Sequence, residues 1–181
     1  MLLMNLLVVR HAIAEDKERF AATGRSDDQR PLTEEGREKM RRAADGLKQV
    51  ARRAHVLASS PLVRARETAE IIGPALRASR IELVEALRPD HRYEEFISWL
   101  RGRDAREEQH EVAEDERTIA IVGHEPHLSG LVTWLMTGTT DSRIELKKGA
   151  ACLLGFSGAP AAGTATLHWA LTPSHLRKLA D

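Results

Sequence analysis

The sequence predicts an α/β protein with three layers, α/β/α, around a mostly parallel central sheet that a C-terminal antiparallel hairpin completes. Two observations predict this class. Short apolar runs typical of buried strands alternate along the chain with longer segments whose apolar residues recur at helical spacing. Near the C-terminus, two strand-like runs are separated only by a short connection that contains Gly and Pro, which is typical of a hairpin.

Length and composition restrict the classes of protein that fit. We expect a single domain over residues 1–181, because 181 residues are enough for one substantial core. Lys plus Arg and Asp plus Glu both number 27, so the zero net charge argues against nucleic-acid and membrane partners. The single cysteine, Cys152, lies in an apolar run, which predicts a buried thiol and a reducing, cytoplasmic compartment. Residues 1–9 lack the basic flank of a signal peptide and are too short to span a membrane.

The first predicted strand ends at two residues with reactive or charged side chains. An apolar run from Leu6 to Val9 stops at Arg10 and His11. The carboxyl ends of buried parallel strands line the ligand crevice of α/β sheets. An Arg there supplies a bidentate donor, and a His supplies a nucleophile or a base.

The next segments cover the mouth of this crevice and then return to the sheet. Residues 14–30 are charged, rich in turn formers and without periodicity, so we expect a loop over the crevice. Thr33 is a candidate cap for a helix that continues to about Arg52. Its apolar positions fall on one helical face.

A second buried strand is predicted over residues 55–60, followed at once by a helix. The Ser60-Pro61 pair ends the strand, and the helical spacing behind it puts Arg64 in the first turn. Arg64 could be an ordinary exposed helix arginine, but its place beside a strand end favours a role at the crevice. A third strand over 81–84 leads to a helix with Phe96, Ile97 and Leu100 as its apolar stripe, and 104–117 is expected to be exposed.

The clearest internal strand spans residues 118–122 and ends at Gly123 and His124. An apolar helix over 128–136 follows, with Pro126 expected in its first turn. The helix start offers backbone N–H groups and a positive dipole to an anion beside His124. The two runs over 149–156 and 164–171 are the predicted antiparallel hairpin.

Three strand ends therefore bring two guanidiniums and two imidazoles to one sheet edge. We expect no metal and no cofactor, because no cluster of Asp, Glu or Cys accompanies these groups. His124-Glu125-Pro126-His127 also departs from the zinc-protease pattern, since Leu128 stands where the second His should be. Positive charge beside a nucleophilic imidazole indicates a phosphate site.

Four ordered motifs extend over nearly the whole chain. They are Val9-Arg10-His11, Arg30-Pro31-Leu32-Thr33 with Gly36, Ser60-Pro61-Leu62-Val63-Arg64-Ala65 with Thr68, and Val122-Gly123-His124. Together these motifs resemble those of the histidine phosphatase superfamily. The compact size, the Arg-Pro-Leu-Thr segment and the tail 169–173 are similar to the short SixA-type phosphohistidine phosphatase branch.

The resemblance implies a phosphoglycerate-mutase-like fold and roles for several of the motif residues. His11 corresponds to the nucleophile that becomes phosphorylated, and Arg10, Arg64 and His124 correspond to ligands of the phosphoryl oxygens, with Arg30 a further candidate. Such a site needs no metal, because guanidiniums and an imidazolium stabilise the equatorial oxygens. The nucleophile must stay neutral, so we expect the other ring nitrogen of His11 to donate to a backbone carbonyl.

Two features depart from the superfamily pattern or leave it open. Ala12 stands where a glycine usually follows the Arg-His pair, and we expect activity to survive this change. The general acid has three candidates, since some members carry it in the region of Glu85 to Asp90 and others directly after the second His, at Glu125.

The leading interpretation is a metal-independent protein phosphohistidine phosphatase whose partner is a phosphorylated protein with a phosphohistidine domain. The first alternative is a phosphatase of small phosphate esters, such as a sugar phosphate. The second is a phosphate-binding interaction module without turnover, whose signature would be a missing nucleophile. The modest length of 14–30 and 87–117 favours an open mouth that admits a protein domain.

Overall fold

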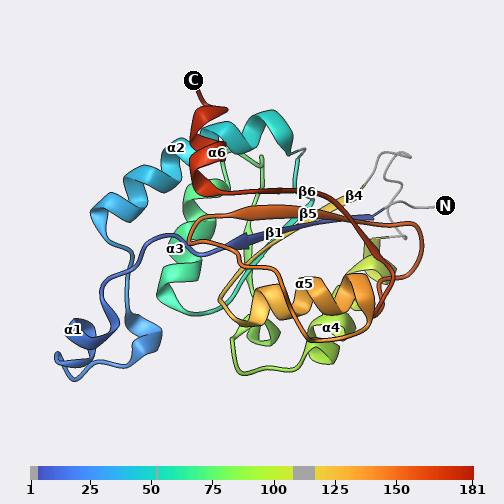
Figure 1. Ribbon diagram of the computed structural model, residues 1–181, viewed down its shortest axis with the longest axis horizontal. Helices are drawn as coiled ribbons and strands as arrows, with labels where there is room; N and C mark the ends of the chain where they lie inside the picture. The colour runs from blue at the N-terminus through green and yellow to red at the C-terminus, as the bar shows by residue number, and fades with distance from the viewer. Residues whose placement is uncertain (1–3, 52, 108–116) are drawn as a thin grey trace.

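A computed structural model describes residues 4–51, 53–107 and 117–181 and has the predicted architecture (Figure 1). The strands are β1 (Met4–Arg10), β2 (Val56–Ser59), β3 (Ile81–Leu83), β4 (Arg117–Gly123), β5 (Ala151–Phe156) and β6 (Ala165–Leu171). The helices are α1 (Lys17–Ala21), α2 (Glu34–Val50), α3 (Val63–Ile72), α4 (Tyr93–Glu107), α5 (His127–Thr137) and α6 (Pro173–Lys178), with short 3-10 helices η1 (Asp27–Gln29) and η2 (Glu85–Leu87).

The six strands form one sheet in the order β3-β2-β4-β1-β5-β6. The strands β1 to β4 pair in parallel, whereas β5 runs antiparallel to both β1 and β6. The predicted class, a mostly parallel sheet completed by an antiparallel hairpin, is therefore confirmed.

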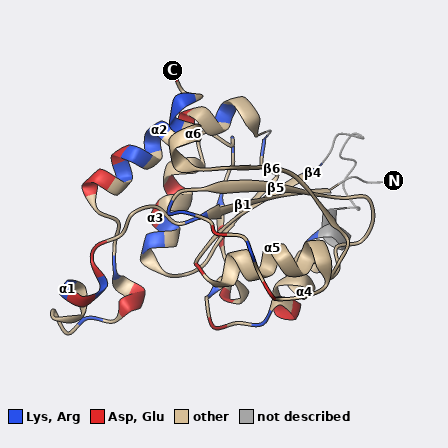
Figure 2. Cartoon of the chain, viewed as in Figure 1, with Lys and Arg blue, Asp and Glu red and all other residues tan. Residues whose placement is uncertain are grey.

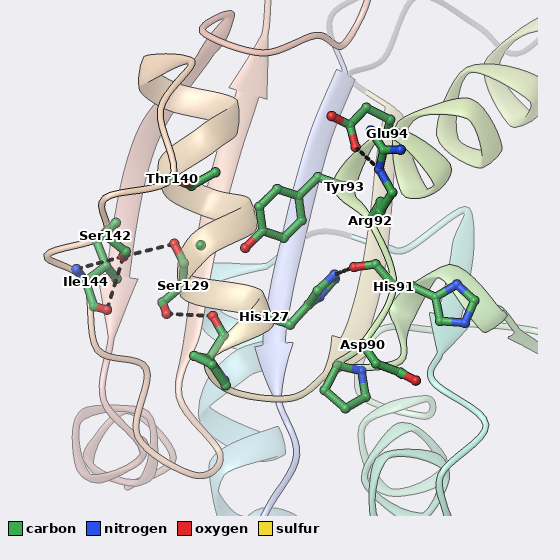
Figure 3. A pocket seen from close by; sticks show the side chains of 13 residues that line it. Asp90, His91, Arg92, Tyr93, Glu94, His127, Ser129, Thr140, Ser142 and Ile144 are labelled. Carbon is green, nitrogen blue, oxygen red and sulfur yellow. Dashed lines mark hydrogen bonds and ion pairs between the residues drawn. The ribbon is translucent and has the colours of Figure 1, made fainter.

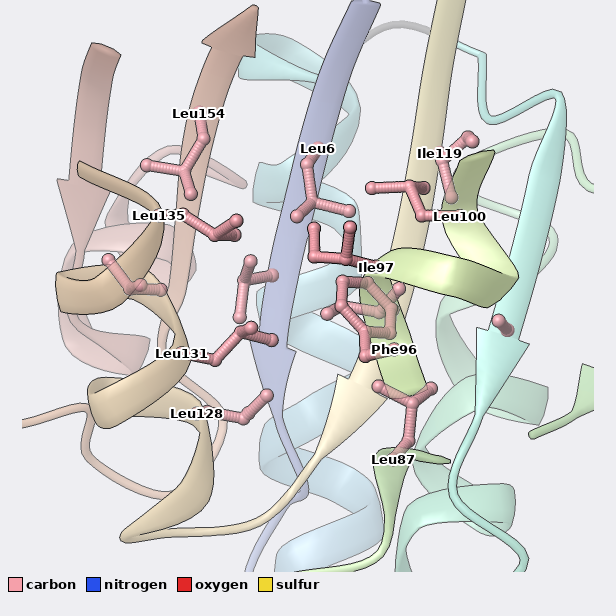
Figure 4. Close-up of a cluster of buried hydrophobic side chains, with 14 of the residues drawn as sticks. Leu6, Leu87, Phe96, Ile97, Leu100, Ile119, Leu128, Leu131, Leu135 and Leu154 are labelled. Carbon is pink, nitrogen blue, oxygen red and sulfur yellow. The ribbon is translucent and has the colours of Figure 1, made fainter. Parts of the chain in front are cut away.

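Each face of the sheet carries its own apolar core, because successive strand residues point to opposite sides. Leu6 and Ile119 belong to the core under α4 and α5, which Figure 4 shows with Phe96, Leu100 and Leu131 packed between sheet and helices. Leu7 and Ala120 belong to the core under α2, α3 and α6. Burial of both faces explains why β1 and β4 read as continuous apolar runs.

Local signals placed most helix ends correctly. Thr33 caps α2 as predicted, since its side chain accepts a hydrogen bond from the Gly36 N–H. The helix ends at Val50, two residues before the expected end. Cys152 is buried, as predicted, and burial raises the pKa of its thiol to about 12.

Two local predictions were wrong, and a third was wrong at its last residue. Residues 14–30 contain α1 and η1 as well as loop, because Asp16 accepts a hydrogen bond from the Arg19 N–H and the buried Phe20 anchors a helix too short to show periodicity. Pro126 lies at the N-cap of α5 rather than in its first turn. Most of 104–117 lies outside the described residues, but Arg117 at its end is buried as the first residue of an inner strand.

Candidate active site

The predicted strand ends do meet at one edge of the sheet. Arg10 lies in register with Gly123, and the N–H of His11 donates to the Gly123 carbonyl across 3.0 Å. The N–H of Ser60, which follows β2, donates to the Val122 carbonyl across 2.9 Å. These backbone bonds fix the starting points of His11, His124 and the α3 segment relative to one another.

A cavity of about 640 Å³ opens at this edge. Its walls include every predicted phosphate-binding residue, namely Arg10, His11, Arg30, Arg64 and His124. The structure therefore brings these five side chains together at one cavity. Figure 2 shows that the segment with α1 and η1, at the mouth, mixes acidic and basic residues, whereas α5 carries neither.

His11 is held as a neutral imidazole with a defined tautomer. Its Nδ1 lies 2.7 Å from the Ala12 carbonyl oxygen. Because a carbonyl can only accept, Nδ1 carries the proton and Nε2 keeps its lone pair. Burial lowers the pKa of His11 to about 3, and the charges of Arg64, Arg10 and Arg30 add to this effect against the Ala12 hydrogen bond.

The backbone after His11 accommodates Ala12 without strain. Among the described residues other than glycine, only Arg77 has a positive φ, so Ala12 needs no glycine-like conformation. Its methyl group is buried in the core beneath α2 and α3. The Ala12 N–H donates to Thr68 Oγ1 across 3.0 Å, and that hydroxyl donates to the Arg64 carbonyl across 2.7 Å. The motif residue Thr68 thus links the His11 peptide to the first turn of α3.

His124 faces His11 across the cavity. The two ring centroids are 5.1 Å apart, and His124 Nε2 forms a 2.8 Å hydrogen bond with Ser60 Oγ. Burial lowers the pKa of His124 to about 2, with further lowering by His11 and Arg64. The sequence placed Ser60 at a strand end and at the start of a motif, but it predicted no contact of Ser60 with His124. The place of Ser60 beside the β4 strand end was the signal that could have assigned it to His124.

The three arginines at the cavity are fixed by backbone carbonyls and by one carboxylate. Arg10 Nη1 donates to the Leu146 carbonyl across 2.6 Å, and burial lowers the pKa of this guanidinium against the charges of Glu125 and Glu145. Arg64 is only 5% exposed, and burial likewise lowers its pKa despite the opposing charge of Asp27. The buried position of Arg64 contradicts an exposed helix arginine.

The geometry separates the three candidate acids. Glu125 lines the cavity, where burial raises its pKa against the hydrogen bond that its Oε2 accepts from Ser129 Oγ at 2.5 Å. Glu85 does not line the cavity, and its side chain is 70% exposed. Asp90 lies at a neighbouring cavity instead. Of the three candidates, the structure therefore brings only Glu125 to the cavity that holds both histidines.

The neighbouring cavity has a volume of about 600 Å³ and shares Pro89 with the first (Figure 3). In Figure 3 the Tyr93 ring points toward α5 beside His127, whose ring centroid is 5.0 Å away. His127 Nε2 donates a hydrogen bond to the His91 carbonyl oxygen across 3.1 Å. His127 is thus part of this second wall and not of the phosphate site.

Within residues 4–51, 53–107 and 117–181, no three His, Cys, Asp or Glu side chains are grouped so that they could hold a metal ion. None of the helices in the described part of the chain has the length and apolar character needed to cross a membrane.

Comparison with known proteins agrees with this geometry. Residues 6–92 match the family model of the histidine phosphatase superfamily (branch 1), a range that includes Arg10, His11, Arg30 and Arg64. An uncharacterized protein of Picosynechococcus sp. is 32% identical over 145 residues, which cover 80% of this chain and 81% of that protein.

Two solved structures show the same fold. The protein histidine phosphatase SixA complexed with tungstate superposes with a TM-score of 0.76 and 24% identity, covering 96% of this chain and 99% of that one. A phosphoglycerate mutase from Bacillus anthracis superposes with a TM-score of 0.65 and 14% identity, covering 99% and 98%. These likenesses confirm the expected phosphoglycerate-mutase-like fold. With its motifs, its fold and its family match in agreement, the chain belongs to the histidine phosphatase superfamily.

Proposed function

We propose that the protein is a metal-independent protein phosphohistidine phosphatase of the SixA type, which works through a phosphohistidine at His11. As a member of the histidine phosphatase superfamily it is a hydrolase of the phosphatase class. The observation that carries the proposal is the Nδ1 contact of His11 with the Ala12 carbonyl, because it leaves Nε2 as the nucleophile inside a cavity with Arg10, Arg64 and His124.

The first step transfers the phosphoryl group to the enzyme. His11 Nε2 attacks phosphorus while the bond from phosphorus to the leaving imidazole nitrogen breaks. Arg10, Arg64 and His124 bind the three oxygens whose charge is spread over the transition state. The raised pKa of Glu125 favours its protonated form, so it can donate a proton to the leaving nitrogen.

The second step returns the enzyme to its starting state. Water attacks the phosphorus, Glu125 takes the proton from water, and the bond from phosphorus to His11 Nε2 breaks. Orthophosphate leaves, and the proton of His11 stays on Nδ1, which donates to the Ala12 carbonyl throughout. Because phosphohistidine has a good leaving group once its ring is protonated, this substrate class makes a smaller demand on the acid than a sugar phosphate does.

Two observations favour a protein substrate. The solved relative SixA is described as a protein histidine phosphatase. The cavity is bordered on one side by short elements, the five-residue α1 and the three-residue η1, as an open mouth for a protein substrate requires.

The test compares purified wild type on a phosphohistidine-bearing domain, a phosphoserine peptide and several sugar phosphates, with and without a chelator. We expect the highest kcat/KM on phosphohistidine, no effect of the chelator, and no turnover by His11→Ala. His175→Ala, an exposed histidine on α6, serves as the control and should retain full activity. A clear preference for a sugar phosphate would favour the small-molecule alternative. Phosphate binding without any turnover would favour the interaction module.

A further inference from the structure

One carboxylate lies within the arginine cluster of the proposed phosphate site. Asp27, the first residue of η1, lines the same cavity as His11. Its Oδ1 accepts a 2.7 Å hydrogen bond from Arg30 Nε, and its Oδ2 lies 3.1 Å from Arg64 Nη2. The carboxylate therefore bridges two guanidiniums.

Asp27 contacts the Arg64 guanidinium through both its backbone carbonyl and its carboxylate. Arg64 Nη1 donates to the backbone carbonyl of Asp27 across 2.9 Å, in addition to the contact of Nη2 with its carboxylate. Two contacts from the two terminal nitrogens of one guanidinium fix both its position and its plane. The Arg64 side chain is 6% exposed and that of Asp27 is 40% exposed, so the carboxylate approaches the buried guanidinium from the solvent side.

Asp27 also offsets the repulsion between its two partners. The charge of Arg30 lowers the pKa of Arg64, whereas the charge and hydrogen bond of Asp27 raise it. Without a carboxylate between them, the two guanidiniums would repel each other and separate. Phosphoryl transfer depends on guanidiniums that are already in position, because reorganising them during the reaction costs rate.

We propose that Asp27 is a positioning residue, which holds the Arg64 and Arg30 guanidiniums in the arrangement that binds the phosphoryl group. This inference rests on the proposed function, since it assigns Arg64 to the phosphoryl oxygens. It also gives η1 a role: the turn brings a carboxylate from the mouth segment to the first turn of α3.

The neighbouring residue provides a matched control. Asp28 follows Asp27 in the same 3-10 turn and pairs with Arg88 Nη2 at 2.5 Å. Arg88 is not part of the cavity wall. Loss of the Asp28 carboxylate therefore removes a contact of η1 but leaves both contacts of Asp27 with Arg64 in place.

A different role for Asp27 makes the opposite prediction. Its carboxylate could occupy the place of the phosphoryl group and compete with it for Arg64. Removing the charge would then strengthen phosphate binding, whereas removing a positioning carboxylate weakens it.

The experiment compares wild type, Asp27→Asn, Asp27→Glu and Asp28→Asn. Steady-state kinetics on p-nitrophenyl phosphate give kcat and KM separately, and calorimetry gives the affinity for orthophosphate. We expect Asp27→Asn to lose about 10- to 100-fold in kcat/KM, with a fall in kcat, because the guanidiniums are displaced in the transition state. Its orthophosphate affinity should fall as well. Asp27→Glu should recover part of both losses, and Asp28→Asn should stay within about twofold of wild type.

Tighter orthophosphate binding by Asp27→Asn would overturn the proposal in favour of competition. Equal losses in Asp27→Asn and Asp28→Asn would also overturn it, because the effect would then come from η1 as a whole. Should the wild type turn over neither p-nitrophenyl phosphate nor a phosphohistidine-bearing domain while Asp27→Asn loses orthophosphate affinity, the proposed function would fail and the positioning role would stand.

Discussion

At the scale of single residues, the site combines two buried neutral histidines with cationic guanidiniums. His11 and His124 have pKa values lowered to about 3 and about 2, so both are neutral before phosphate arrives. A neutral His11 is what a nucleophile requires, but a neutral His124 cannot compensate a phosphate dianion by its charge. Binding of the anion must therefore raise the pKa of His124.

We predict that orthophosphate binding is accompanied by proton uptake at His124. The negative charge beside the ring offsets the burial that lowers its pKa. Calorimetry in buffers of different ionisation enthalpy measures the protons taken up, and His124→Asn should abolish that part of the signal. Binding with the same proton count in wild type and variant would contradict the prediction.

We expect Arg64 to bind the phosphoryl group through two nitrogen atoms of its planar guanidinium, and not only through its positive charge. Arg64→Lys keeps the charge but loses the second donor nitrogen and the planar geometry, so transition-state stabilisation should fall by about 2–4 kcal/mol. The matched control is Arg66→Lys, two residues along α3, where the side chain is exposed. Steady-state kinetics of the two variants decide this, and near-normal kcat/KM for Arg64→Lys would exclude a bidentate role.

At the scale of elements, α2 and α6 approach each other where a side chain would not fit. A Cβ on Gly46 of α2 would lie 1.7 Å from the Leu176 carbonyl oxygen of α6. Gly46→Ala should therefore lower the free energy of unfolding by about 1–3 kcal/mol through overpacking. Gly102→Ala in α4 meets nothing within 4 Å and should be neutral or stabilising, because alanine favours a helix. Urea unfolding of the two variants tests this, and equal stabilities would contradict it.

Element types followed from the sequence more readily than the contacts between elements. The buried runs of β1 and β4, the Thr33 cap and the hairpin have local signals, and each was predicted. The helix α1 was missed because five residues are too few to show a period. The contact of Asp27 with Arg64 joins residues 37 positions apart, and the distance between them follows only from the folded chain. For the same reason the sequence left three candidates for the general acid, Glu85, Asp90 and Glu125. In the folded chain, only Glu125 of these three lines the cavity of His11 and His124.

At the scale of the whole molecule, burying two neutral histidines links stability to pH. Unfolding returns their pKa values from about 3 and about 2 toward the ordinary 6.5, so the unfolded chain binds more protons below pH 6.5. Their contribution is fully present above about pH 6.5, declines as pH falls below 6.5, and is lost once pH has fallen through the folded-state values. Chemical denaturation between pH 4 and 8 should show stability falling toward acid, with a smaller slope in His124→Asn. An unchanged slope in that variant would contradict the assignment.

The covalent phosphohistidine is tested most directly by trapping it. A single turnover quenched in alkali and analysed by mass spectrometry should place phosphate on His11, with acid treatment removing the label, because a phosphorylated imidazole is acid-labile. His11→Ala should carry no label, whereas His124→Ala should still be labelled at His11 at a lower rate. Turnover of wild type with no phosphate on His11, together with inversion at a chiral phosphorus, would contradict the double-displacement mechanism.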